Sequence, residues 1–322
     1  MNKCPFYFPL ENGRYEVKPG LYPLGTDFGN GQLEHRTFQI DTNYDKYIRE
    51  KRQALNNKIE NYYCTFNPSL STLVRICSYI AYQLNKEYPT FYSLETNSDQ
   101  ITLLCRPIGK LKPKKIVIPI NYSATNLNLL LSVMNQLLLI IQEDIAIVEL
   151  TDEADDFISL LHLCFPNYWS ATEKIGKSFI DAHKPVPEMQ SIQKRSKQLI
   201  SALIEKGPFV RFAWGLSTDD RLDHHFESDT KSFQNSETDK LFNSRDPKLY
   251  LRVERQVITG FSDVNSFMFT IRTYIYNVAE LKRNVKKRDA LISALGTMSE
   301  ATLKYKGLFN SKDLILEWLN DK

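Results

Sequence analysis

Three segments in the second half of the chain alternate apolar and polar side chains, which is typical of β-strands that bury one face. They occupy residues 209–216, 248–258 and 266–276. Because only a short turn separates the last two, we expect them to pair in antiparallel order. The sequence contains no G-x-G-x-x-G, G-x-x-x-x-G-K-[ST], H-E-x-x-H or G-x-S-x-G motif, so the common Rossmann, P-loop and hydrolase interpretations fail. The chain therefore predicts an α+β fold built on an antiparallel sheet.

Helical and strand patterns fill the rest of the chain. Apolar residues at helical spacing predict helices over 44–60, 68–87, 127–143 and 191–206, and from 278 to the C-terminus. Apolar runs predict strands over 101–105 and 115–120, and a hairpin of 145–150 with 157–165. No linker divides the chain, so we expect a single compact domain with flanking helices. Its parts are a turn-rich wrapping arm (1–43), a core (44–276) and C-terminal helices (277–322).

Charge and cysteine content exclude several classes of protein. The chain carries 41 basic and 38 acidic residues, a net charge of +3, which argues against a dedicated nucleic-acid binder. Its five cysteines are an odd number without a C-x-x-C pair. We therefore expect neither a disulfide framework nor structural zinc, and a cytoplasmic location. The longest apolar run, 127–141, is too short and too polar to span a bilayer, so we predict a buried helix and no membrane partner.

Five histidines leave few possible sets of metal ligands. His224 and His225 lie in a polar stretch, 219–243, that is predicted to be a loop. With nearby aspartates they could bind a metal, but a solvated loop is the interpretation we favour. His162 falls in an apolar strand, where a core histidine is expected. Cys164 follows it, as a rival metal ligand or, the favoured interpretation, as a core thiol.

His183 stands where a helix is predicted to end. S-A-T-E at 170–173 forms a capping box, which predicts a helix over 171–182. The helix must stop near His183, because Lys184 precedes Pro185 and is pushed into extended geometry. A histidine held in this way can be aimed into a cavity, as an axial haem ligand must be. The alternative is a histidine that stabilises the helix C-terminus through the helix dipole.

Arginines within the predicted strands are the other unusual feature. Alternation puts Arg255 on the apolar face of its strand, and Arg272 lies in the strand that follows. The face opposite Arg255 carries Arg252, Glu254 and Gln256. A guanidinium on an apolar face must be paired or must meet an anion. One interpretation is a ladder of Arg–Glu pairs, and the other is that these arginines bind carboxylates such as haem propionates. Arg211 and Trp214 of the remaining strand could line the same space.

Seven segments in order along the chain carry a family resemblance. They are LYPLG, IDTNYDKYIREKR, QEDIAIVEL, CFPNYWSATEKIGKSFIDAHKPVP, VRFAW, LRVERQV and FMFTIRTY. Together they resemble the α-subunit-like family of haem-dependent oxidative N-demethylases (dimethylamine monooxygenases). The matching segments extend from about residue 21 to residue 276, which is most of the chain. The block from Cys164 to Pro187 and the pair RVERQ and FTIRTY are its most specific parts.

The resemblance implies a PAS-like fold, in which an antiparallel sheet with flanking helices holds a b-type haem. It implies an oxygen-dependent monooxygenase that oxidatively demethylates a small methylated amine such as dimethylamine and releases formaldehyde. Electrons in this family come from NADPH through flavin and iron–sulfur centres on separate reductase components. The absence of a nucleotide fingerprint here suits a haem subunit that depends on such a partner.

Matched residue by residue, the resemblance makes His183 of DAHKPVP the expected axial ligand of the haem iron. It makes Arg252, Arg255 and Arg272 candidates for propionate binding or for structural pairing. Arg211 belongs to the same set of cofactor-binding candidates. No catalytic residue is assigned.

One position departs from the family pattern. Where the family usually has Arg-x-Asn-Trp, this chain has Arg211, Phe, Ala213 and Trp214. Trp214 remains a cofactor-binding candidate, but Ala213 cannot make the hydrogen bonds of an asparagine. The alternative function is therefore a non-enzymatic haem-binding PAS-like sensor or interaction protein.

Overall fold

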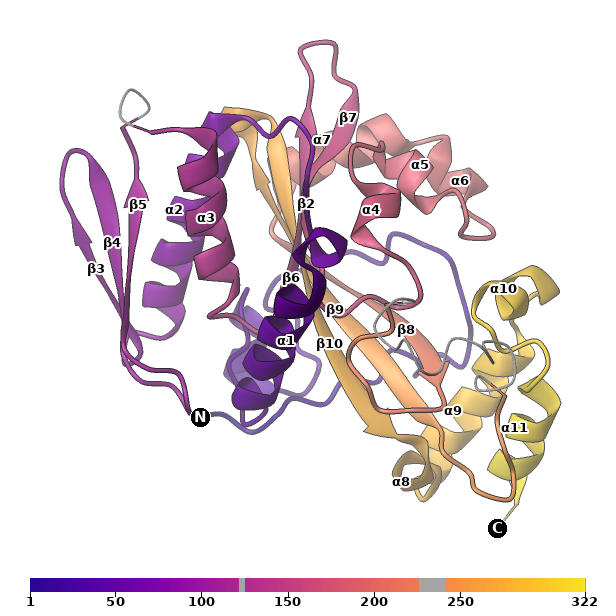
Figure 1. The fold of residues 1–322 in the computed structure, drawn as a ribbon. Coiled ribbons are helices and arrows are strands. Elements are labelled where there is room, and N and C mark those ends of the chain that lie inside the picture. The colour runs from indigo at the N-terminus through magenta and orange to yellow at the C-terminus, as the bar shows by residue number, and fades with distance from the viewer. Residues whose placement is uncertain (122–124, 226–240, 322) are drawn as a thin grey trace.

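The computed structural model describes residues 1–121, 125–225 and 241–321. Its centre is a seven-stranded antiparallel sheet, which confirms the predicted α+β class (Figure 1). In sheet order the strands are β1 Tyr22–Pro23, β8 Phe209–Ser217, β9 Tyr250–Phe261, β10 Ser266–Asn277, β6 Asp144–Leu150, β7 Asp156–His162 and β2 Tyr63–Thr65. Strands β9 and β10 pair along their whole length, joined by the short 3-10 helix η4 Ser262–Val264. They place the site described below.

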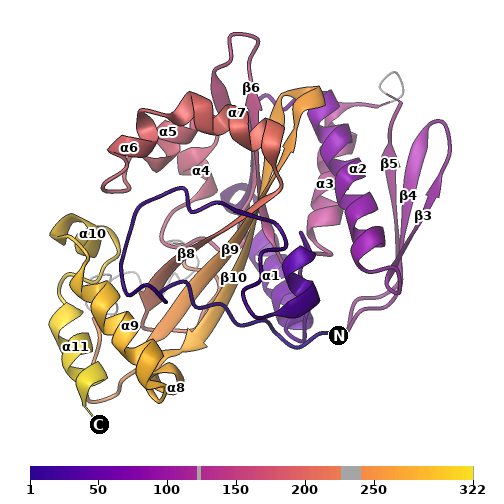
Figure 2. The same ribbon diagram turned by 180° about the vertical axis from the view of Figure 1, so that it is seen from behind.

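One face of the sheet is covered by helices from the middle of the chain (Figure 2). They are α4 Ala171–Lys174, α5 Phe179–His183, α6 Gln190–Gln193 and α7 Ser196–Lys206. The predicted capping box is present, because Ser170 and Glu173 each accept the other's backbone N–H. The helix predicted over 171–182 is interrupted at Gly176, where φ is +75° and the N–H bonds to the carbonyl of Ile158 in β7. The helix predicted over 191–206 is likewise split into α6 and α7.

The other face of β8, β9 and β10 packs against the C-terminal helices. They are α8 Val278–Lys282, α9 Val285–Gly296, α10 Glu300–Tyr305 and α11 Lys312–Asn320. Leu251 and Val253 of β9 join Leu291 and Leu295 of α9 in one hydrophobic cluster. The apolar face that the alternation in β9 predicted is thus the face buried under these helices.

A smaller sheet stands beside the large one (Figure 1). It consists of β3 Tyr92–Thr96, β4 Gln100–Cys105 and β5 Lys114–Pro119, with α2 Leu70–Glu87 and α3 Leu127–Leu138. Helix α3 ends earlier than the prediction of 143. Its continuation carries Gln142 and Glu143, which are buried and accept the backbone N–H groups of Asp41 and Gln39. Those hydrogen bonds draw the chain out of the helix and towards the N-terminal segment.

The first 43 residues form an arm that runs in a wide loop over β8 and β9 before α1 Tyr44–Tyr62 (Figure 2). It contains the short 3-10 helix η1 Gly31–His35. The arm pairs with the sheet edge through β1 and β8. It is also tied to the C-terminal part of the chain, because Tyr15 N–H donates to Thr297 Oγ1 and Tyr7 N–H to the Tyr276 hydroxyl. The arm thereby closes one side of the cavity described next.

Candidate functional site

A cavity of about 720 Å³ lies between the large sheet, helices α5 to α7 and the N-terminal arm. This volume is in the range of small-molecule and cofactor sites. Its apolar lining includes Ala146, Val148, Ile158, Ile258, Phe267, Phe269 and Ile271 from the sheet, Phe179, Ala182, Met189, Ile192, Leu199 and Leu203 from the helices, and Tyr7, Phe8, Leu21 and Phe28 from the arm. Charged side chains of the arm, the sheet and the helices interrupt this apolar wall, and they decide what the cavity can bind.

His183 lines this cavity from the last position of α5. The helix ends where the sequence predicts, and Ser178 caps its start by accepting the Asp181 N–H. The backbone beyond it differs from the prediction, because Lys184 stays in the helical region (φ −51°, ψ −35°) instead of becoming extended. Its N–H bonds to the Asp181 carbonyl, which offsets the steric cost of a helical residue before Pro185.

The His183 imidazole is fixed by its own helix. Its Nδ1 lies 2.7 Å from the Phe179 carbonyl, and the two rings pack with centroids 4.4 Å apart. Because a carbonyl only accepts, Nδ1 carries the proton, which leaves the lone pair of the neutral ring on Nε2. Burial lowers the pKa of His183 to about 4, so the ring is neutral at physiological pH. A neutral histidine whose Nδ1–H is held by a carbonyl is typical of a metal ligand that binds through Nε2.

Cations line the cavity from several elements: Arg211 of β8, Lys174 of α4 and Lys306, which follows α10, together with Arg14 and Lys18 of the arm. Arg211 makes no hydrogen bond or ion pair with a described residue, and its Nε is buried without a partner. Lys174 lies 3.8 Å from the centre of the Trp169 ring. Burial lowers the pKa of Lys174 and Lys306 to about 8. Cations that are desolvated and incompletely paired favour an anionic ligand.

Glu254 is the carboxylate that the sheet brings to the same cavity. It lies in β9 directly opposite Ala213 of β8, and it accepts a 3.0 Å hydrogen bond from Gln256. Its negative charge raises the pKa of Lys174 and Lys306 against the larger effect of burial. Glu254 is therefore the carboxylate that the sheet contributes, with the methyl group of Ala213 beside it, while Glu11, Glu16 and Asp27 line the cavity from the arm.

The other predicted arginines do not line the cavity. Arg255 and Arg272 project from the opposite side of the sheet, since their neighbours Val253 and Tyr274 belong to the cluster under the C-terminal helices. Arg255 donates to two carbonyls of the arm, and Arg272 pairs with Asp41 at 2.8 Å, both side chains being fully buried.

Arg252 lies beyond the end of the cavity, where its Nη atoms donate to the carbonyls of Phe165 and Leu222. Its Nε also lies 3.8 Å from Glu254, so the Arg–Glu ladder expected between strands is reduced to one long contact within β9. Of the six predicted site residues, the cavity brings together His183, Arg211 and Trp214.

The prediction of a solvated loop at His224 and His225 is wrong, since both side chains are 2% exposed. The His224 Nε2 is paired with Asp219 at 2.9 Å, and its ring stacks on Tyr168. The His225 N–H donates to Asp223. Aromatic stacking and local aspartates bury a segment whose polar composition predicted exposure. The remainder of the predicted loop, 226–240, lies outside the described residues.

A separate buried group consists of Asp144, His162 and Cys164, whose ligand atoms lie within 4.8 Å of one another. The Lys51 ammonium lies 3.6 Å from Asp144 and balances the charge of that carboxylate. Burial raises the pKa of the Cys164 thiol well above its usual value, which keeps it protonated. His162 and Cys164 thus occupy the core, as predicted, and neither lines the 720 Å³ cavity.

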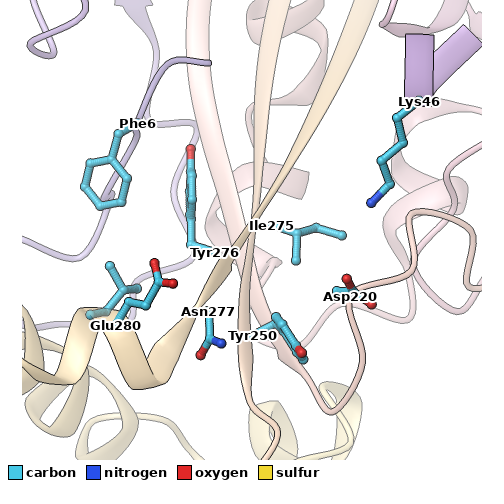
Figure 3. A pocket seen from close by; sticks show the side chains of 9 residues that line it. Phe6, Lys46, Asp220, Tyr250, Ile275, Tyr276, Asn277 and Glu280 are labelled. Carbon is cyan, nitrogen blue, oxygen red and sulfur yellow. The ribbon is translucent and has the colours of Figure 1, made fainter. Parts of the chain in front are cut away.

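A second cavity, of about 370 Å³, opens beside the last residues of β10 (Figure 3). Lys46, Asp220 and Glu280 stand around it, and the Lys46 side chain points towards Asp220. Tyr250 and Tyr276 form part of its wall. Its lining contains no histidine or cysteine and none of the predicted site residues.

The family comparison agrees with the site. A protein-family model described as haem-dependent oxidative N-demethylase, alpha subunit-like, matches residues 31–316. The chain belongs to this family. The match confirms the resemblance found in the sequence, and the description of an α subunit implies an assembly with other chains. No helix among the described residues of this N-demethylase family member is both long and apolar enough to cross a bilayer.

The donor set of the cavity fits the haem that the family name specifies. His183 offers an oriented, neutral nitrogen, Arg211 has an orphaned buried Nε, and the wall around them is apolar. Sequence reasoning missed Lys174, Lys306 and Glu254. The position of Glu254 could have been predicted, because alternation in its strand already placed it on the face opposite the buried apolar face.

Proposed function

We propose that this N-demethylase family member binds haem b in the 720 Å³ cavity and acts as a subunit of an oxygen-dependent monooxygenase. Its reaction is the oxidative N-demethylation of a small methylated amine, such as dimethylamine, with release of formaldehyde. The observation that carries the proposal is His183, a neutral histidine in the cavity with its Nδ1 held by the Phe179 carbonyl. Family membership over residues 31–316 supports it.

In this proposal His183 binds the haem iron through Nε2, and Arg211, Lys174 and Lys306 supply positive charge for the propionates. The bound haem supplies the centre at which oxygen is activated and the amine methyl group is hydroxylated. The chain itself contributes two features. Its apolar wall excludes water, and the Nε2 of His183 is already oriented and unprotonated before haem binds. We assign a structural role to the other three predicted arginines, because they already donate to backbone carbonyls or to Asp41. They are Arg252, Arg255 and Arg272.

Glu254 is the residue we propose to meet the substrate. A small methylated amine is a cation at neutral pH, and a carboxylate in an apolar cavity attracts it. The hydrogen bond from Gln256 fixes the direction of the Glu254 side chain.

The remaining parts of the proposal concern the surroundings of the site. We propose a PAS-like haem module over 44–276, with the arm 1–43 and the helices 277–322 as additions to it. Electrons would come from NADPH through flavin and iron–sulfur centres of separate reductase components. A cytoplasmic location is supported by the five free cysteines.

Ala213 favours a second candidate function. Its methyl group lines the cavity opposite Glu254 and can make no hydrogen bond to oxygen or amine. A haem-binding sensor or interaction protein that lacks turnover would tolerate this position. Haem binding is common to both candidates, and formaldehyde production distinguishes them.

The first test is the visible absorption spectrum of the protein reconstituted with haem. We expect a Soret band that is lost or shifted in His183→Ala and retained in His35→Ala, a matched change at an exposed histidine. An unchanged band in His183→Ala would reject the ligand assignment. The second test is formaldehyde release from dimethylamine with oxygen and a competent reductase. Haem binding without formaldehyde would favour the sensor.

A further inference from the structure

The densest run of basic residues in the sequence lies at the junction of α8 and α9. Five of the seven residues from 282 to 288 are basic, although the whole chain has a net charge of only +3. These five residues, Lys282, Arg283, Lys286, Lys287 and Arg288, are called here the basic ridge. Arg288 pairs with Asp289 at 2.9 Å. Arg283 and Lys286 are exposed and form no ion pair with a described residue.

Two residues of the basic ridge occupy a position that is unfavourable for folding, whereas Lys282 lies in the last turn of α8, where a cation is favourable. Lys286 and Lys287 lie in the first turn of α9, which contains no acidic residue. The N-terminal end of a helix dipole is positive and disfavours cations. Charges that oppose the local structure in this way are typical of functional surfaces.

The basic ridge contains one exposed apolar side chain, and docking surfaces commonly combine apolar and charged groups. Val285 lies within it and is 57% exposed. Two of its cations are held in place by aromatic rings. The Lys287 Nζ lies 4.0 Å from the centre of the Phe6 ring, and the Lys282 Nζ lies 4.7 Å from that of Trp318. Held side chains lose less entropy when a partner binds.

Aromatic residues connect the basic ridge to the 720 Å³ cavity. The Lys287 Nζ is 6.0 Å from the centre of the Phe8 ring, and Phe8 lines that cavity. Tyr7, between Phe6 and Phe8 in the arm, lines it too and packs on Phe212 with centroids 4.9 Å apart. A protein bound at the ridge would therefore be separated from the cavity by a few aromatic side chains.

We propose that the basic ridge is the docking surface for the acidic protein that donates electrons to this site, an inference that rests on the proposed function. The positive charge of the ridge favours a partner with an acidic surface. The aromatic side chains between the ridge and the cavity favour, among acidic partners, one that donates electrons. The balance of the reaction requires such a donor. Each monooxygenation consumes two electrons and two protons, while one oxygen atom enters the methyl group and the other leaves as water.

The binding experiment uses the haem-free protein and, as the probe, an acidic plant-type [2Fe–2S] ferredoxin. Carbodiimide cross-linking followed by peptide mapping should join ferredoxin carboxylates to Lys282, Lys286 or Lys287. The double variant R283E/K286E should bind the ferredoxin about tenfold more weakly, and the affinity of the parent protein should fall with salt. The matched control is K194E/K197E, which makes the same change of charge at exposed positions near α7.

Three results would overturn the proposal. Cross-links could map to another surface, the control variant could lose as much affinity as R283E/K286E, or anionic phospholipid vesicles could bind the ridge more tightly than the ferredoxin does. A second readout uses protein reconstituted with haem. Reduction by ferredoxin should slow in R283E/K286E, while reduction by dithionite, a small reductant, should not. If no haem binds, the proposed function fails, whereas cross-linking to the haem-free protein still tests the docking surface.

Discussion

The arginines of the central strands differ according to whether they line the 720 Å³ cavity. On the face under the C-terminal helices, Arg255 donates to a backbone carbonyl of the arm and Arg272 donates to the carboxylate of Asp41. On the cavity face, Arg211 makes no hydrogen bond or ion pair with a described residue, although its Nε is buried. The same residue type in one sheet is thus supplied with acceptors under the C-terminal helices, and also at Arg252 beyond the end of the cavity, whereas Arg211, which lines the cavity, is left without them among the described residues.

This contrast indicates which arginines serve the fold and which can serve a ligand. A buried charge without a partner is costly, so a structural arginine is expected to have its acceptors built in. Arg272 has the Asp41 carboxylate and also lies 3.6 Å from the centre of the Tyr47 ring. Arg211 faces a cavity in which an anion can supply the missing partner.

The largest expected effect is on the structural side. Arg272→Met removes one partner of a buried ion pair and leaves Asp41 charged in the core. We expect the free energy of unfolding to fall by about 3–5 kcal/mol, measured by urea denaturation. The double variant Asp41→Asn with Arg272→Met should recover part of this loss. A loss below about 1 kcal/mol in the single variant would remove the distinction between the two faces.

Arg211→Met should show the reverse pattern. Because Arg211 has no partner among the described residues, we expect the free energy of unfolding to change by less than about 1 kcal/mol. Haem affinity should fall about tenfold or more, since a charged hydrogen bond to a propionate is lost. Spectroscopic titration with haem measures this, with Arg195→Met at an exposed position as the control. Strong destabilisation with unchanged haem affinity would place Arg211 among the structural arginines.

Local patterns explain what the sequence could predict. Alternation gave the three long strands, and the capping box predicted the hydrogen bonds that Ser170 and Glu173 make. The position of Pro185 placed a helix end at His183, although Lys184 is helical and not extended as that signal predicted. Each of these signals depends on residues a few positions apart, where backbone geometry alone limits the possible structures.

The partners of the arginines depend on contacts that local patterns do not contain. Asp41 and Arg272 are 231 positions apart in the sequence. Alternation assigned Glu254 to the polar face of its strand, but the pattern does not distinguish a face exposed to solvent from one that lines a cavity. Lys306 enters the cavity from the C-terminal helices without any signal in its neighbours. His224 was predicted to be exposed because the composition of its segment does not reveal that its ring stacks on Tyr168.

His183 provides a pH test of the cavity face. Its pKa is about 4 in the folded protein because of burial, against about 6.5 for an ordinary histidine. Between these two values the unfolded chain binds a proton and the native chain does not, so stability falls as the pH is lowered through this window. We expect His183→Gln to reduce this loss by at least about 1 kcal/mol between pH 7 and pH 4.5, measured by urea denaturation of haem-free protein. His35→Gln should keep the full loss, and an identical pH profile in both variants would contradict the assignment.

The smallest expected effect concerns the coupling of charges within the cavity. Burial lowers the pKa of Lys174 and Lys306 to about 8, and Glu254 opposes that shift. Glu254→Gln should therefore lower both pKa values further, by less than about one unit. Nuclear magnetic resonance titration of ¹³C-dimethylated lysines would measure this, with the exposed Glu205→Gln as the control. Unchanged or raised lysine pKa values would mean that Glu254 does not share the electrostatics of the cavity. Lowered lysine pKa values would mean that the cavity loses positive charge near pH 8 when Glu254, the carboxylate contributed by the sheet, is removed. Arg255 and Arg272, whose acceptors lie in the arm, should not respond to this change.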